Sequence, residues 1–129
     1  MATDPQFAST IRTAVAQVST ANTNRDGTGT IVTVFTAGSS GSRIETVDIT
    51  ATGTTTAGMI RLFLHDGTNA RLLTEQPVPA RTPSATAAAF QFTLVFGDYR
   101  PLLLANTWSL RASTEKAETF NIHVFASTY

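Results

Sequence analysis

Short apolar runs separated by turn-forming residues recur along nearly the whole chain, and this pattern restricts the possible folds more than any other feature. Its clearest instance is the segment AGMIRLFLHDGTNARLLTEQ, Ala57–Gln76. Two apolar runs flank a tip with Asp66-Gly67 and then Asn69, and these residue types tolerate the backbone angles of a reversal between antiparallel strands. The repetition along the chain predicts an all-β protein, an antiparallel β-sandwich.

Turn residues divide the chain into about eight predicted strands. The first strand overlaps a second pattern, because Phe7, Ile11 and Val15 also fall at helical spacing, so a short helix is an alternative there. Met1–Thr10 shows no alternation and is predicted to be an N-terminal arm, which leaves residues 11–129 as a single domain. The predicted strands are approximately Thr13–Thr20, Gly29–Thr36, Arg43–Thr52, Gly58–His65, Ala70–Pro77, Ala88–Phe96, Thr107–Ser113 and Thr119–Ala126.

Strict alternation of apolar and polar residues assigns one face of several strands to the core. Burying each large apolar side chain contributes roughly 1.5–3 kcal/mol before conformational entropy is subtracted. The substitution Phe92→Ala is therefore expected to cost about 3–5 kcal/mol. The side chains predicted to face inward are Val47, Ile49 and Ala51; Ile60, Leu62 and Leu64; Phe90, Phe92, Leu94 and Phe96; Trp108, Leu110 and Ala112; and Phe120, Ile122, Val124 and Ala126.

Two ways of connecting the strands fit a sandwich of this size. A jelly roll is the favoured arrangement, and an immunoglobulin-like sandwich is the alternative. In the jelly-roll arrangement the first, third, sixth and eighth predicted strands form one sheet, and the other four form the second sheet. The order of the strands within each sheet stays open.

Some large apolar side chains fall on the polar side of their predicted strands. Met59 and Phe63 do so in one strand and Phe125 in the last, while Phe35 belongs to a strand that is apolar on both faces. Outward apolar groups are covered either by loops of the same chain or by another subunit. The candidate protein-contact residues are Phe7, Met59, Arg61, Phe63, His65 and Phe125.

The composition argues against several classes of partner. Charged residues make up 14% of the chain, below the usual quarter, and the formal net charge is +0. A chain without net charge has no strong field to attract nucleic acid or an anionic membrane, so neither is expected as a partner. The chain has no cysteine, which excludes disulfides and thiolate chemistry. Neither a secretory signal nor an apolar run of membrane-spanning length is recognisable.

No motif predicts catalysis or a bound cofactor. Asn22–Gly27 reproduces the start of a calcium-binding loop, N-x-N-x-D-G, but its twelfth position is Thr33 instead of a bidentate glutamate, so a polar turn is the favoured interpretation. The two histidines, His65 and His123, do not supply the three or four convergent ligands of a metal site. A G-x-S-x-G nucleophile elbow is also absent from the sequence. The protein is predicted to be non-enzymatic.

Several longer stretches carry a family resemblance. They are Thr20–Ile31 (TANTNRDGTGTI), Gly53–Glu75 (GTTTAGMIRLFLHDGTNARLLTE) and Thr82–Phe90 (TPSATAAAF), and Leu110–Ala126 (LRASTEKAETFNIHVFA) matches the same style. Through them the chain resembles a family of small proteins encoded among the virion genes of tailed bacteriophages. These stretches are turns and strands, so the resemblance assigns no functional residue.

The resemblance implies a virion structural protein and, by size and fold, a capsid decoration (cement) protein bound to the outside of the head shell. Its partners would be the major capsid protein or another virion protein, together with further copies of itself, with a trimer favoured. Such a protein is made in the host cytoplasm and ends in the virion, on the capsid surface. The alternative is a tail, neck or fibre-associated adaptor, or a host-glycan-binding module.

Overall fold

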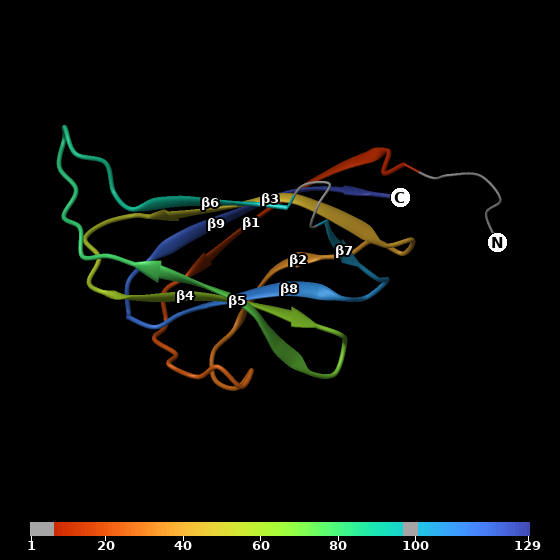
Figure 1. Cartoon of the computed structure of the whole chain (residues 1–129), viewed down its shortest axis with the longest axis horizontal. Coiled ribbons are helices and arrows are strands. Elements are labelled where there is room, and N and C mark those ends of the chain that lie inside the picture. Colours follow the sequence, from red (N-terminus) through yellow and green to blue (C-terminus); the bar gives the residue numbers. More distant parts are fainter. Residues whose placement is uncertain (1–6, 97–100) are drawn as a thin grey trace.

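Nine β-strands in two antiparallel sheets, and no helix, are found in residues 7–96 and 101–129, the part of the chain that the computed structural model describes (Figure 1). The predicted all-β antiparallel sandwich is confirmed. Sheet A contains, in spatial order, β1 (Thr10–Val18), β9 (Phe120–Thr128), β3 (Ser42–Ala51) and β6 (Gln91–Val95), with β7 (Leu102–Leu104) also paired to β3. Sheet B contains, in spatial order, β2 (Val32–Thr36), β8 (Ser109–Thr114), β4 (Gly58–His65) and β5 (Ala70–Val78).

The strands divide between the sheets as the jelly-roll arrangement requires. The first, third, sixth and eighth predicted strands correspond to β1, β3, β6 and β9, which all lie in sheet A, and the other four lie in sheet B. Figure 1 shows the two sheets as stacked layers, with the start of β1 and the end of β9 at the same end of the sandwich.

The first strand begins at Thr10, before the predicted start at Thr13. Strand β1 pairs with β9 along its whole length, from Thr10 opposite Thr128 to Val18 opposite Phe120, so the helical alternative for this segment is wrong. Ser9 continues this pairing, because its N–H donates to the carbonyl of Thr128 at 3.1 Å. Residues 1–6 of the predicted arm lie outside the described residues.

Strand β7 lies in a segment that the turn residues of the sequence predict to be a break. It pairs with Ser42–Ile44 of β3, while β6 pairs with Thr46–Thr50, so both strands complete the same edge of β3. A β-bulge at Glu45 separates the two halves of β3. Residues 97–100 between β6 and β7 lie outside the described residues. The three-residue length of β7 and the proline just before it hide this strand from a pattern search.

The core fills the space between the two sheets. The predicted inward faces of β3, β4 and β9 are confirmed, and the ring of Phe90 packs edge-to-face on Phe120 with centroids 6.4 Å apart. The fully buried apolar side chains of this core include Ile44, Val47, Ile49, Ile60, Leu62, Leu110, Phe120, Ile122 and Val124.

The predicted inward face of β6 is only partly buried. Phe92 points to the same side as its pairing partner Ile49, yet it is 37% exposed, because β6 is the edge strand of sheet A. Leu94 and Phe96 are half-buried for the same reason. The edge of sheet B, β5, lies opposite, and an apolar groove of about 410 Å³ opens between the two edges, lined by Leu73, Leu94, Phe96 and Leu102 among others.

Trp108 is not part of the core in which alternation places it. Trp108 precedes β8 and is 36% exposed. It ends a tight turn in which its N–H donates to the carbonyl of Ala105 at 3.1 Å and Thr107 has a φ of 72°. The inward alternation of β8 therefore consists of Leu110 and Ala112 alone.

The opposite edge of the sandwich is closed by Arg12 of β1. Its guanidinium lies 5.4 Å from the ring centroid of Phe35 on β2 and donates to the Thr36 carbonyl at 3.4 Å. A β-bulge between Thr33 and Phe35 places both Val34 and Phe35 in the core. The bulge explains why alternation alone leaves Phe35 without an assigned face.

The different exposure of two phenylalanines provides a test of the packing. Phe120→Ala is expected to lower the free energy of unfolding by about 3–5 kcal/mol, because it empties a fully enclosed site. Phe92→Ala is expected to cost only about 1–2 kcal/mol, because much of that ring still contacts water. Urea unfolding followed by circular dichroism measures both losses. Equal losses would show that Phe92 is as buried as Phe120.

Candidate functional site

A long loop, residues 19–31, crosses the outer face of sheet B (Figure 1). We call it the cover loop. At its start the N–H of Asn22 donates to the Thr114 carbonyl of β8 at 2.8 Å. Further along, the Nε of Arg25 donates to Oε1 of Glu75 on β5 at 2.7 Å, and Gly27 packs directly against the Ala70 carbonyl. The cover loop is therefore attached to both β8 and β5.

Hydrogen bonds inside the cover loop show that Asn22–Gly27 is a polar turn. The amide Nδ2 of the buried Asn22 donates to the carbonyls of Thr28 and Thr30 at 2.9 and 3.0 Å. The carboxylate of Asp26 accepts from the hydroxyl and the N–H of Thr28, and these bonds lower the pKa of Asp26. The side chains of the calcium-like pattern thus hold the loop itself.

Beneath the cover loop lies a buried cation. Arg61 is 1% exposed, with its Nε 3.6 Å from Oε2 of Glu75 and its Nη2 3.8 Å from Oε1 of Glu115. Its Nη1 donates to the carbonyl of Asn22 at 3.4 Å. The hydrogen bond from Arg25 is the main cause that lowers the pKa of Glu75, so this carboxylate stays ionised beside Arg61. The cluster joins two arginines and two glutamates around the start of the cover loop.

The structure separates the candidate contact residues into buried and exposed sets. Phe63 lies on the same side of β4 as Arg61 and is 0% exposed, so its own chain covers it. Arg61 is also buried, so neither side chain is exposed for contact with another protein. Met59 is half-buried. Phe7 is 85% exposed and Phe125 is 41% exposed. Of the two ways to cover an outward apolar group, coverage by the same chain is the one found for Phe63.

Phe125 belongs to an exposed apolar surface on the outer side of sheet A. Pairing across the sheet places Phe125 between Thr13 of β1 and Thr46 of β3, with Val95 of β6 next in the same row. We call this surface the sheet A face. Its large apolar members, from 41% to 85% exposed, are Ile11, Val15, Val95, Leu103 and Phe125.

Sequence reasoning missed four members of the sheet A face. In β1 the small residues Ala14 and Ala16 turn inward, while the larger Ile11 and Val15 turn outward, which reverses the usual pattern. The signal was present in the period of two, because Ile11 and Val15 alternate with these alanines. It was obscured because the same residues also fit a helical spacing.

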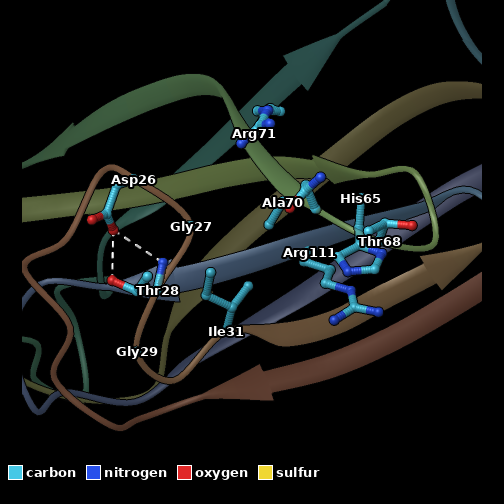
Figure 2. Close-up of a pocket in the computed structure, with 11 residues that line it drawn as sticks. Asp26, Gly27, Thr28, Gly29, Ile31, His65, Thr68, Ala70, Arg71 and Arg111 are labelled. Carbon is cyan, nitrogen blue, oxygen red and sulfur yellow. Dashed lines mark hydrogen bonds between the residues drawn. The ribbon is translucent and has the colours of Figure 1, made fainter.

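His65 lies in a separate polar pocket of about 260 Å³, between the cover loop and the tip of the β4–β5 hairpin (Figure 2). Its Nδ1 accepts the N–H of Gly67 at 3.0 Å. Next to it, the Nε of Arg111 on β8 donates to Oγ of Ser109 at 3.1 Å. No group of three or more histidine, aspartate or glutamate side chains that could hold a metal ion is found among the described residues. The side chains of the pocket wall are those of Asp26, Thr28, Ile31, His65, Arg71 and Arg111, among others.

Comparisons with known proteins add no assignment. No protein-family model matches the chain, and a search of curated proteins finds no match. Within residues 7–96 and 101–129 no helix is long and apolar enough to cross a membrane. The two outer faces of the sandwich, one covered and one open, are the features that bear on function.

The Glu75 carboxylate should attach the cover loop in a pH-dependent way. Because its pKa is lowered in the folded state, its stabilisation is present above the unfolded pKa of about 4.3 and is lost as the pH falls through the folded pKa. Glu75→Gln is expected to lower the melting temperature at pH 7 and to have less effect at more acidic pH. It should also speed trypsin cleavage after Arg25.

Glu45→Gln serves as the control, because Glu45 forms an exposed ion pair with Arg43 away from the cover loop. Thermal unfolding across pH and timed proteolysis compare the two variants. If both variants behave alike, Glu75 does not hold the cover loop.

Proposed function

We propose that the protein is a non-enzymatic structural protein of a tailed-bacteriophage virion, a decoration (cement) protein that binds the outside of the head shell and stabilises it. The resemblance of Thr20–Ile31 and Gly53–Glu75 to virion proteins is the source of this proposal. The observation that carries it is the sheet A face, an exposed apolar surface on a sandwich whose other face is covered by its own loop. Several large apolar side chains exposed on one face are typical of protein–protein contacts.

The charges of the sheet A face support contact with a second copy. Asp48 of β3 and His123 of β9 are paired neighbours on this face. Arg43 and Glu45 form an ion pair of 3.2 Å at its border. A surface with few and balanced charges packs against a copy of itself without like-charge repulsion. Among the described residues β1 is an edge strand of sheet A, and the unpaired backbone groups of such an edge favour assembly.

A trimer around a symmetry axis of the shell is the assembly we favour. Such an arrangement repeats one pair of surface patches around the axis and buries the exposed part of Phe125. Phe63 takes no part in it, because the chain itself already covers this residue.

The N-terminal arm is the proposed contact with the shell. Phe7 is 85% exposed and precedes β1, so its ring is available to a groove of the major capsid protein. An aromatic side chain in a partner's pocket is a common anchor of protein interfaces.

A tail, neck or fibre adaptor could use the same sheet A face, and the position of the protein in an imaged virion separates these locations from the head shell.

A substitution that introduces a single charge on the sheet A face tests the self-association. Wild-type protein is expected to form a concentration-dependent trimer in sedimentation velocity. Phe125→Asp should weaken association at least tenfold, because a carboxylate would be buried without a partner. Arg81→Asp, in an exposed loop outside the sheet A face, is the matched control and should not change association. A wild-type protein that stays monomeric at all concentrations would contradict the proposal.

The arm can be tested on the virion itself. Purified heads stripped of the protein are incubated with wild-type protein, with a variant lacking residues 1–10, and with Phe7→Ser. Both variants should be retained at least tenfold less, because the aromatic anchor is lost. Undiminished retention would remove the arm from the mechanism, while binding to tails instead of heads would favour the adaptor.

A further inference from the structure

Strand β1 forms a long and regular edge of sheet A. Among the described residues, no strand pairs with β1 on the side away from β9. The strand has nine residues, and all nine pair with β9 without a bulge. The backbone groups on its free side therefore form an uninterrupted row of donors and acceptors, which is a template for another strand.

The other edges that the described strands form carry features that hinder the addition of a strand. Strand β5 contains Arg71, Glu75 and Pro77, and a proline has no N–H to donate. Strand β2 has only five residues and is bulged between Thr33 and Phe35. The edge of sheet A opposite β1 is divided between β6, of five residues, and β7, of three. Only β1 is at once long, regular and free of proline.

The side chains of β1 leave this edge accessible and without charge on its outward side. Its charged residue, Arg12, is turned to its own chain, where the guanidinium stacks on Phe35 and donates to Oγ1 of Thr128 at 3.3 Å. The outward side chains Ile11 and Val15 are 85% and 67% exposed. An identical strand at this edge therefore meets no like charge on the outward side.

The sequence of β1 fits a second copy of itself. When two identical strands pair antiparallel about a two-fold axis at Thr13, Ile11 of each copy lies opposite Val15 of the other. Thr13 then lies opposite Thr13, so apolar groups meet apolar groups and hydroxyls meet hydroxyls. Moving the axis to Ala14 would place Ile11 opposite Gln17 and lose this match.

We propose that two copies of the protein pair through their β1 edges, antiparallel about a two-fold axis at Thr13, so that sheet A continues from one copy into the other. Arg12 of each copy lies opposite Ala14, so the two guanidinium groups do not face each other. The outward surface around Phe125 stays free for the trimer.

One pair of strands is a small interface, so the contact is weak in dilute solution and becomes effective where many copies are held close together. In a decoration shell it joins neighbouring trimers. This role rests on the proposed function, whereas the pair of β1 edges does not.

The absence of cysteine from the chain makes disulfide cross-linking a direct test. Opposed residues of an antiparallel pair have Cα atoms about 4.5–5.5 Å apart, a distance that a disulfide spans. Thr13→Cys, oxidised with diamide in concentrated full-length protein, is therefore expected to form a covalent dimer. Thr33→Cys, at an exposed position of the bulged edge strand β2, is the matched control and should cross-link about tenfold more slowly.

A mixture of Ile11→Cys and Val15→Cys tests the direction and register of the pair. The two variants should cross-link with each other. Each variant alone should cross-link more slowly, because the same residue of the second copy lies roughly 13 Å further along the strand. A parallel pair would instead link each variant to itself.

Adding Phe125→Asp to Thr13→Cys separates the edge pair from the trimer. The aspartate is expected to weaken the trimer contact and to leave the cross-link between β1 edges intact. The proposal is overturned by a Thr13→Cys cross-link no faster than that of Thr33→Cys, by a self-link of Ile11→Cys as fast as the mixture, or by loss of the cross-link in the Phe125→Asp background. A cross-link that persists where no trimer forms would contradict the proposed trimer and support the edge pair.

Discussion

The buried guanidinium of Arg61 is the interaction on which the arrangement of sheet B depends. Removing a cation from water costs several kcal/mol unless opposite charges and hydrogen bonds replace the lost solvation. Glu75 from β5, Glu115 after β8 and the Asn22 carbonyl provide that replacement. Because the Asn22 carbonyl belongs to the cover loop, the position of this loop and the burial of Arg61 are coupled.

The cover loop makes the two outer faces of the sandwich different. On sheet B it buries the central part of the face and leaves a polar pocket at the hairpin tip. On sheet A no loop of the described residues plays this part, and Ile11, Val15 and Phe125 stay exposed. A protein with one closed and one open apolar face has a defined side for attachment. The proposed assembly surface and the polar pocket therefore lie on different sides of the sandwich.

The two long edges of the sandwich also differ. At the β1–β2 edge, Arg12 stacks on Phe35 and joins the two sheets. At the β5–β6 edge no such side chain bridges the gap among the described residues, and the apolar groove lined by Leu73 and Leu94 stays open. Alternation places Phe92 on the inward side correctly, but the side chain is partly exposed because its strand is at the edge. The face of a side chain is thus a local property, whereas its burial depends on what lies opposite.

Local pattern was enough to determine the class of fold. Alternation along β3, β4 and β9, with turn residues between the strands, identified most strands and the side that each turns to the core, because the period of a strand is set by its own backbone. For the candidate sites, alternation placed Phe125 on the outward side of its strand, and the turn residues placed His65 at a hairpin tip. Alternation alone could not resolve Phe35, where a bulge changes the period.

Only the tertiary structure decided which outward groups are available. Arg61 and Phe63 look like surface residues in their strand, but the folded chain buries both, and a loop about forty residues earlier in the sequence contacts Arg61. The pocket likewise requires Asp26, His65 and Arg111 to come together from three separate segments. Such contacts depend on the packing of distant elements, which no local period encodes, so burial and site formation emerge only once the two sheets and the cover loop have assembled.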